Sequence, residues 1–244
     1  ADGSLLFRPA GHGALLENLN DLKADVIFIK NIDNVVPDAL KQPTIEYKKA
    51  LGGLLLWILE GIEHLDKQLQ ENPTEATINE SLQEMATYLG FVPSAEFAAS
   101  SQEEKITKIR EVLARPTRVC GVVKNTGEPG GGPFWCQDEV GNSTLQLVES
   151  AQVDLAHEGQ KSIFTGSTHF NPVDLVCATR GCDLREYRDM MTGFITEKTK
   201  DGKSLKAQEL PGLWNGAMAK WNTVFVEVPL ETFNPVKSVT DLLR

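Results

Sequence analysis

The chain has 244 residues, of which 41% are hydrophobic and 24% charged, and its formal net charge at pH 7 is −10. These values are typical of a globular protein with a sizeable core, and the negative charge argues against a general nucleic-acid or anionic-membrane surface. The longest apolar run, Leu54–Leu59, is too short to span a bilayer. No segment resembles a signal peptide, and the four cysteines stand singly, which indicates reduced thiols. We therefore expect a cytoplasmic protein without a nucleic-acid or membrane partner.

The first predicted region, residues 1–45, combines a helix, a strand and a polar loop. Apolar residues between Ala14 and Leu22 recur at helical spacing. Val26–Ile29 is an apolar, β-favouring run that predicts a strand buried on both faces, as in a parallel sheet. Asn31-Ile32-Asp33-Asn34 follows directly, and Pro37 and Pro43 then indicate a loop. Ligands in α/β sheets bind beyond the carboxyl ends of strands, so this polar segment is a candidate ligand site.

The second predicted region, residues 46–115, is helical and acidic. Apolar spacing predicts helices over 47–69, 78–89 and 101–113. Ser101 with Glu104 three residues later is the signature of a capping box. We interpret this region as a helical insertion packed on a sheet, with its many glutamates on a solvated face.

The third predicted region, residues 116–244, is richer in strands. Strands are expected over 118–124, 145–149, 173–178 and 224–228, with Gly- and Pro-rich loops at 127–133, 166–172 and 211–216. At the end of the chain, 239–243 has the pattern of a helix. Residues 1–45 and 116–244 together predict one α/β domain.

Two short motifs near the start of the chain are candidates for ligand binding. Gly11-His12-Gly13 precedes a helix, where backbone amides and the helix N-terminus favour an anion, although a simple tight turn explains the glycines as well. In Asn31-Ile32-Asp33-Asn34 a carboxylate between two amides suits Mg²⁺ and sugar hydroxyls. An Asx-turn that caps the local backbone is an equal alternative there.

Three later features are weaker evidence for a ligand site when each is considered alone. The consecutive glycines 130–132 suggest a backbone that must come close to something, or else a flexible hairpin tip. Glu149 ends a predicted strand with a carboxylate that would accept from sugar hydroxyls or simply face water. Lys237 follows Pro235, where an ammonium would neutralise phosphoryl charge, although most lysines are only solvated.

The order of these motifs resembles that of the UDP-sugar pyrophosphorylase family. Gly11-His12-Gly13 and Asn31–Asn34 match two segments of its glucose branch, and Val148-Glu149-Ser150 is similar to the sugar-binding segment of its N-acetylhexosamine branch. Further elements of the family are partly matched around His169, at Asn215-Gly216 and from Phe233 to Lys237. The resemblance covers 8–38 and 117–244. The chain also resembles a bacterial family of longer proteins described as a domain of unknown function.

The resemblance implies a Rossmann-like, glycosyltransferase-A-like nucleotidyltransferase fold with a mixed sheet, whose N-terminal strands lie outside this chain. It implies a Mg²⁺-dependent reaction of a nucleoside triphosphate with a sugar 1-phosphate to give an NDP-sugar and pyrophosphate. Asp33 would hold the metal. The catalytic residues would be Lys237, which would stabilise phosphate charge, and His12, which would orient phosphate or base. The substrate-binding residues would be Gly11, Gly13, Asn31, Asn34, Glu149, His169, Asn215 and Gly216.

One departure from the family leaves other functions open. The Gly-rich, basic loop that cradles the triphosphate in the pyrophosphorylases has no counterpart in this sequence. Either a preceding segment or second chain supplies it, or the protein does not bind a nucleotide in the usual way. The alternatives are a non-catalytic sugar-phosphate-binding or regulatory protein and a different phosphoryl-transfer or hydrolytic enzyme.

Overall fold

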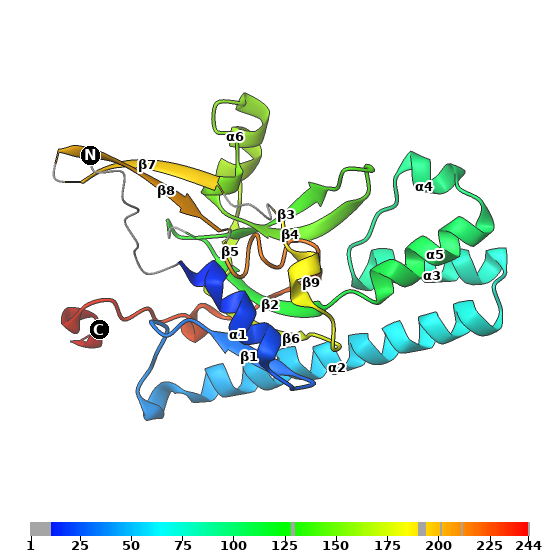
Figure 1. Cartoon of the computed structure of the whole chain (residues 1–244). Helices are drawn as coiled ribbons and strands as arrows, with labels where there is room; N and C mark the ends of the chain where they lie inside the picture. Colours follow the sequence, from blue (N-terminus) through cyan, green and yellow to red (C-terminus); the bar gives the residue numbers. More distant parts are fainter. Residues whose placement is uncertain (1–10, 128–129, 190–193, 201, 211, 244) are drawn as a thin grey trace.

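The fold is a mixed α/β arrangement built on a five-stranded central sheet (Figure 1). The computed structural model describes residues 11–127, 130–189, 194–200, 202–210 and 212–243. The strands of the sheet are β1 (Ile27–Lys30), β2 (Thr117–Lys124), β5 (His169–Phe170), β6 (Asp174–Ala178) and β9 (Asn222–Glu227). They follow the order β1-β6-β2-β5, and β9 pairs with β2. Because β9 runs parallel to β2 whereas the other pairs are antiparallel, the sheet is mixed, which confirms the expected fold class.

The predicted pairing and burial of the first strand are wrong. β1 was predicted as a strand of a parallel sheet buried on both faces, but it pairs antiparallel with β6, and Phe28 is 54% exposed. A Cβ added at Gly52 would lie 3.1 Å from the Phe28 ring, so helix α2 (Gln42–Glu71) covers only part of this residue. An apolar run indicates a strand but does not determine its neighbours, because a bulky residue at a sheet border also packs against a single helix.

The three predicted helices of the acidic region are confirmed and joined by a short fourth. The helices of the chain are α1 (Leu15–Asp21), α2 (Gln42–Glu71), α3 (Glu75–Tyr88), α4 (Ala95–Ala99), α5 (Gln102–Leu113) and α6 (Glu158–Thr165). Ser101 and Glu104 form the predicted capping box. Pro43 does not mark a loop but lies in the first turn of α2, where its missing N–H costs no helical hydrogen bond.

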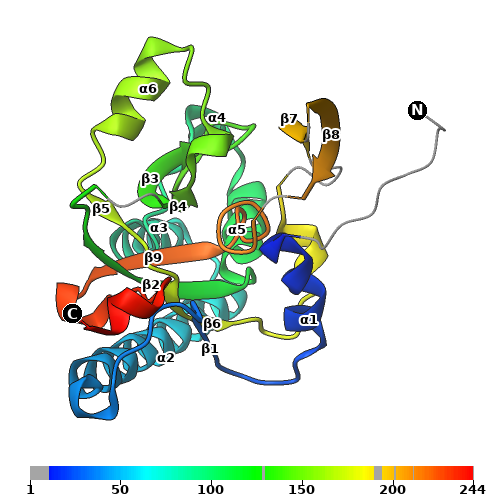
Figure 2. The ribbon, with the colours of Figure 1, turned by 90° about the vertical axis from the view of Figure 1, so that its left-hand side faces the viewer.

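Apolar side chains cover both faces of the sheet. On one face, Leu51 and Leu55 of α2 share a core with Val119 and Val176, so the helical region packs on the sheet as expected. On the other face, α1 and the segment 213–221 enclose a second core that includes Cys120. Figure 2 shows α1 and α2 on different sides of the sheet. The proposed division into an α/β domain and a helical insertion stays a prediction.

Two hairpins complete the fold. They are β3 (Gly132–Gln137) with β4 (Ser143–Val148), and β7 (Phe194–Lys200) with β8 (Lys203–Glu209). Only β4 was predicted, because the other strands are Gly-rich or polar and show little apolar alternation. The expected terminal helix is a 3-10 helix, η6 (Val239–Leu243). Over the described residues, none of the helices combines the length and apolar character that a membrane crossing requires.

Candidate functional site

A cavity of about 190 Å³ lies where the sheet is interrupted between β5 and β6. Five segments form its walls: the loop after β1, the glycines before β3, the end of β4 with Trp214, the segment 170–173 between β5 and β6, and the chain after β9. Its polar and charged lining residues are Asn31, Asp33, Asn34, Glu149, Asn171 and Lys237. The structure therefore brings together five of the predicted site residues, which lie as far apart in the sequence as positions 31 and 237.

The predicted Asn31–Asn34 loop is fixed by hydrogen bonds to distant backbone. The Asn31 N–H donates to the carbonyl of Val173 at 2.9 Å. The buried Asn34 amide donates to the Thr232 carbonyl at 3.0 Å and accepts from the Asn234 N–H at 2.7 Å. Asn34 thereby ties the loop to the segment that carries Lys237. Its amide is occupied by backbone partners, so the contact with a sugar that was predicted for it stays a prediction.

The segment that contains Lys237 is held by a side chain of the following turn. The Asp241 carboxylate accepts from the backbone N–H groups of Lys237 and Ser238 at 3.1 and 2.9 Å. The Lys237 side chain lines the cavity together with Asp33. Hydrogen bonds thus hold the backbone that carries both residues. A binding site needs such support to keep its charged groups in place.

Two hydrogen-bond donors orient the Glu149 carboxylate. Trp214 donates its indole Nε1–H to one carboxylate oxygen at 3.1 Å, and Asn215 donates its amide to the other at 3.3 Å. The His12 ring stacks on Trp214 at a centroid distance of 4.0 Å and an interplanar angle of 7°. The predicted residues His12, Glu149 and Asn215 therefore belong to one group, in which Glu149 lines the cavity and the other two support it.

His12 is held as a neutral imidazole. Its Nδ1 accepts from the Leu213 N–H at 2.8 Å. Burial lowers the pKa of His12 below its ordinary value of 6.5, and the nearby Glu149 charge raises it by less. A neutral ring acts here as an acceptor and a stacking partner for Trp214.

The other predicted residues lie away from the cavity. Gly11 and Gly13 flank the first turn before α1, and the Gly216 carbonyl accepts from the Asp189 N–H at 2.8 Å. The His169 Nε2 lies 3.5 Å from a carboxylate oxygen of Glu227. His169 and Phe170 are adjacent on a strand and point to opposite faces, and it is Phe170 that lines the cavity. Substrate contacts for these four residues stay predictions.

The predicted loop at 166–172 includes Asn171 and Pro172, but sequence reasoning did not identify the break at residues 171–173 as a part of the site that shapes the cavity. Asn171 donates its side-chain amide to the Gly121 carbonyl at 2.6 Å and accepts from the Val173 N–H at 3.0 Å. Val173 has a φ of 58°, which is a strained conformation for a β-branched residue and is typical of functional sites. The Asn171-Pro172 dipeptide is a turn signal within the predicted loop.

The backbone of the glycine run before β3 packs closely against side chains, which agrees with the first of the two interpretations of its sequence. A Cβ at Gly131 would clash with the Leu147 side chain and would lie 3.1 Å from the Glu149 Cγ. Gly130 and Gly131 line the cavity next to Glu149. Glycine is required here because the run packs directly on β4. Residues 128–129 of the run, and residues 8–10 of the matched N-terminal segment, lie outside the described residues.

A fully buried arginine, Arg118, supports the site from the core, and sequence reasoning did not identify it. Arg118 donates to the Thr223 hydroxyl at 2.9 Å, to the Gln146 side-chain oxygen at 3.3 Å, and to the Trp214 carbonyl. Burial lowers the pKa of this guanidinium. Arg118 thus connects the central strand to the residue that orients Glu149.

The cavity fits Mg²⁺ only together with oxygen atoms from a ligand. Asp33 supplies one carboxylate, and the described residues contain no group of three or more His, Cys, Asp or Glu side chains arranged around a common point. Proteins commonly hold Mg²⁺ with one or two carboxylates together with substrate phosphates and water. Asp33 is therefore a suitable ligand for Mg²⁺ carried in by a phosphorylated substrate.

Replacing His12 by glutamine should make the protein less sensitive to acid. Because the folded pKa of His12 lies below its unfolded value, the unfolded chain binds the proton first as the pH falls. The stabilising contribution is complete above pH 6.5 and is lost as the pH falls below 6.5 through the folded pKa. Urea unfolding between pH 8 and 5 should show a shallower loss of stability for His12→Gln than for the wild type. The exposed His64→Gln variant should keep the wild-type slope, and equal slopes for all three proteins would contradict the prediction.

Comparison with known proteins assigns the chain to a family. Solved structures with partial similarity include a UDP-glucose pyrophosphorylase mutant from Leishmania major, with 17% identity, a TM-score of 0.39, and coverage of 60% of this chain and 34% of that chain. A UDP-glucose phosphorylase from Trypanosoma brucei has 20% identity, a TM-score of 0.36, and coverage of 60% and 32%. The chain thus spans about one third of the length of these proteins. No curated protein matches. The family model described as Domain of unknown function (DUF4301) matches residues 1–244, and the chain belongs to this family.

Proposed function

We propose that this protein is a nucleotidyltransferase that forms an NDP-sugar and pyrophosphate from a nucleoside triphosphate and a sugar 1-phosphate with Mg²⁺. The observation that carries the proposal is the convergence of Asp33, Lys237 and Glu149 on one cavity. A metal-binding carboxylate, a cation for phosphate and an acceptor for hydroxyl groups are the three groups that a sugar phosphate requires. The motif order shared with the UDP-sugar pyrophosphorylases supports the same conclusion.

The size of the cavity suits the sugar phosphate and not the whole product. At about 190 Å³ it is smaller than the roughly 300–1,000 Å³ typical of sites for larger ligands. We assign the sugar to the Glu149 side and the phosphate to the side of Asp33 and Lys237. The nucleotide would then extend outside the cavity.

The chemistry that follows is mainly positioning and charge neutralisation. A phosphate oxygen of the sugar phosphate attacks the α-phosphorus in line, a new P–O bond forms, and the bond to pyrophosphate breaks. Mg²⁺, when bound with the substrates at Asp33, supplies charge neutralisation. Lys237 stabilises phosphate charge, and Glu149, fixed by Trp214 and Asn215, orients the sugar through its hydroxyl groups.

Pyrophosphate release tests the proposal. The chain with Mg²⁺ is incubated with each nucleoside triphosphate and each member of a sugar 1-phosphate panel, and pyrophosphate and NDP-sugar are measured together. We expect equal amounts of both products, and only when both substrates are present. If no pair gives pyrophosphate, in this chain or in a longer natural protein that contains it, the enzymatic proposal is wrong.

A non-catalytic sugar-phosphate-binding protein is the second candidate. The small size of the cavity favours it. Calorimetry with sugar 1-phosphates separates the two: binding without turnover supports the second candidate, whereas turnover excludes it. Inorganic phosphate released from a nucleoside triphosphate in place of pyrophosphate would indicate a hydrolytic enzyme.

A further inference from the structure

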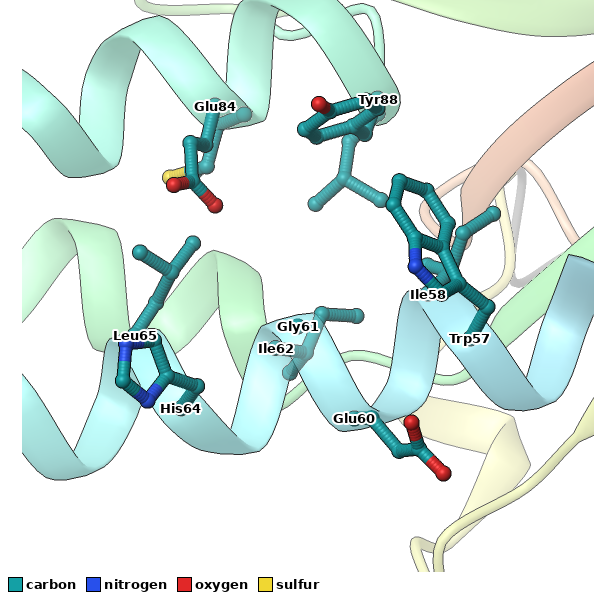
Figure 3. Close-up of a pocket in the computed structure, with 11 residues that line it drawn as sticks. Trp57, Ile58, Glu60, Gly61, Ile62, His64, Leu65, Glu84 and Tyr88 are labelled. Carbon is teal, nitrogen blue, oxygen red and sulfur yellow. The ribbon is translucent and has the colours of Figure 1, made fainter.

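A second cavity of about 270 Å³ lies between α2 and α3, within the helical region (Figure 3). It shares no lining residue with the cavity described above. Its wall is mainly apolar, with Ile58, Ile62 and Leu65 from α2 and with Met85 and Leu89 from the other side. Apolar cavities of roughly 150 Å³ hold a benzene molecule. This cavity therefore has room for one ring and a short side chain.

Two exposed aromatic side chains form one end of this cavity. Trp57 and Tyr88 meet edge to face, with ring centroids 4.9 Å apart and an interplanar angle of 87°. They remain 51% and 42% exposed, which is unusual for large aromatic residues that already contact each other. The pair presents ring faces and edges to whatever enters the space between the two helices, as Figure 3 shows.

Gly61 keeps the floor of the cavity open. It lies in the middle of α2, and a Cβ added there would meet nothing within 4 Å. Glycine inside a helix is unfavourable relative to alanine. Neither a turn nor close packing among the described residues requires this glycine. What its missing side chain does preserve is the space between Trp57 and Leu65.

The charges around the cavity are negative. Glu84 projects from α3 toward α2, beside Tyr88, whereas Glu60 lies at the outer border (Figure 3). Neither lysine nor arginine lines the cavity. Within the described residues, Glu84 is in no ion pair, so its charge is available to a ligand. A carboxylate next to two aromatic rings is an arrangement that recognises an organic cation.

We propose that this cavity binds a small organic amine with an aromatic body. The ring would lie on Gly61 among the aliphatic side chains, and the ammonium group would lie between the Glu84 carboxylate and the Trp57–Tyr88 pair. The site is independent of the proposed nucleotidyltransferase activity. It assigns a ligand-binding role to the helical region, for which the pyrophosphorylase resemblance offers no counterpart.

Calorimetry and tryptophan fluorescence with three probes of similar size test the charge preference. We expect 2-phenylethylamine to bind, 2-phenylethanol to bind about fivefold to tenfold more weakly, and phenylacetate not to bind, because the ammonium gains the cation–π and ion-pair contacts. Glu84→Gln should reduce the preference for the amine over the alcohol to near one. Glu80→Gln, one turn away on α3 and outside the lining, is the matched control and should keep the preference.

Gly61→Leu tests the location. The leucine side chain should fill the cavity and abolish binding of the amine, whereas Gly53→Leu, at an exposed glycine eight residues earlier, should leave binding unchanged. Both substitutions favour the helix, so loss of folding is not expected, and circular dichroism checks this. Failure of the amine to bind the wild type, equal binding of amine and alcohol, or unchanged binding by Gly61→Leu would each overturn the proposal. None of these outcomes bears on pyrophosphate release.

Discussion

Replacing Arg118 by alanine should reduce the free energy of unfolding by about 3–5 kcal/mol, the largest effect on stability expected for this chain. The substitution removes a fully buried side chain and leaves a cavity. It also leaves the carbonyl of Trp214 without this donor and removes one of the two donors of the Gln146 side-chain oxygen. Urea unfolding followed by circular dichroism measures the loss. Fluorescence of the tryptophans should change in the native state as well, because Trp214 loses its support.

Two variants separate the causes of this effect. Arg118→Met keeps most of the side-chain volume but none of the donors, so its stability should lie between those of the wild type and Arg118→Ala. Arg110→Ala removes an exposed guanidinium that pairs with Asp66 at 2.7 Å, and it should cost only about 0–1 kcal/mol. Similar losses for Arg110→Ala and Arg118→Ala would show that the buried hydrogen bonds contribute little.

Replacing Lys237 by methionine should lower the rate of pyrophosphate release by about 100-fold to 1,000-fold. Under the proposed function, its ammonium stabilises charge that develops on the phosphoryl groups, and a methionine of similar length keeps the packing but not the charge. The lysine is exposed and its backbone is fixed by Asp241, so the fold should be unaffected. Steady-state kinetics should show the loss mainly in kcat, with a smaller rise in KM for the sugar phosphate.

An exposed lysine elsewhere provides the control for this prediction. Lys203→Met on the β7–β8 hairpin removes the same charge far from the cavity and should leave the kinetics unchanged. Asp33→Asn should also lower the rate, and its loss should be partly recovered at higher Mg²⁺ concentration if Asp33 holds the metal. A Lys237→Met enzyme with wild-type kcat would remove Lys237 from the mechanism.

Local patterns in the sequence determined most of the secondary structure and part of the site. The capping box at Ser101, the apolar spacing of α2 and the apolar run of β2 depend on neighbouring residues, so they were visible without a fold. The polar loop at 31–34 and Lys237 were found by motif order, and the structure places them around one cavity. The polar strands β7 and β8 were missed because their pairing depends on each other and not on apolar alternation.

Which of these residues contact one another, and with which hydrogen-bond partners, depends on the tertiary structure. His12 stacks on Trp214, and Asn34 forms hydrogen bonds with backbone groups. Both contacts join segments about 200 positions apart in the chain, and no local pattern contains such contacts. Arg118 lies in an apolar strand whose pattern predicts burial. The pattern does not predict the four hydrogen-bond acceptors of Arg118, which come from other parts of the chain. The antiparallel pairing of β1 likewise depends on β6. Local sequence patterns thus predicted most of the elements and the candidate chemistry, whereas the packing of distant segments forms the site, because burial and hydrogen-bond partners exist only after the chain has folded.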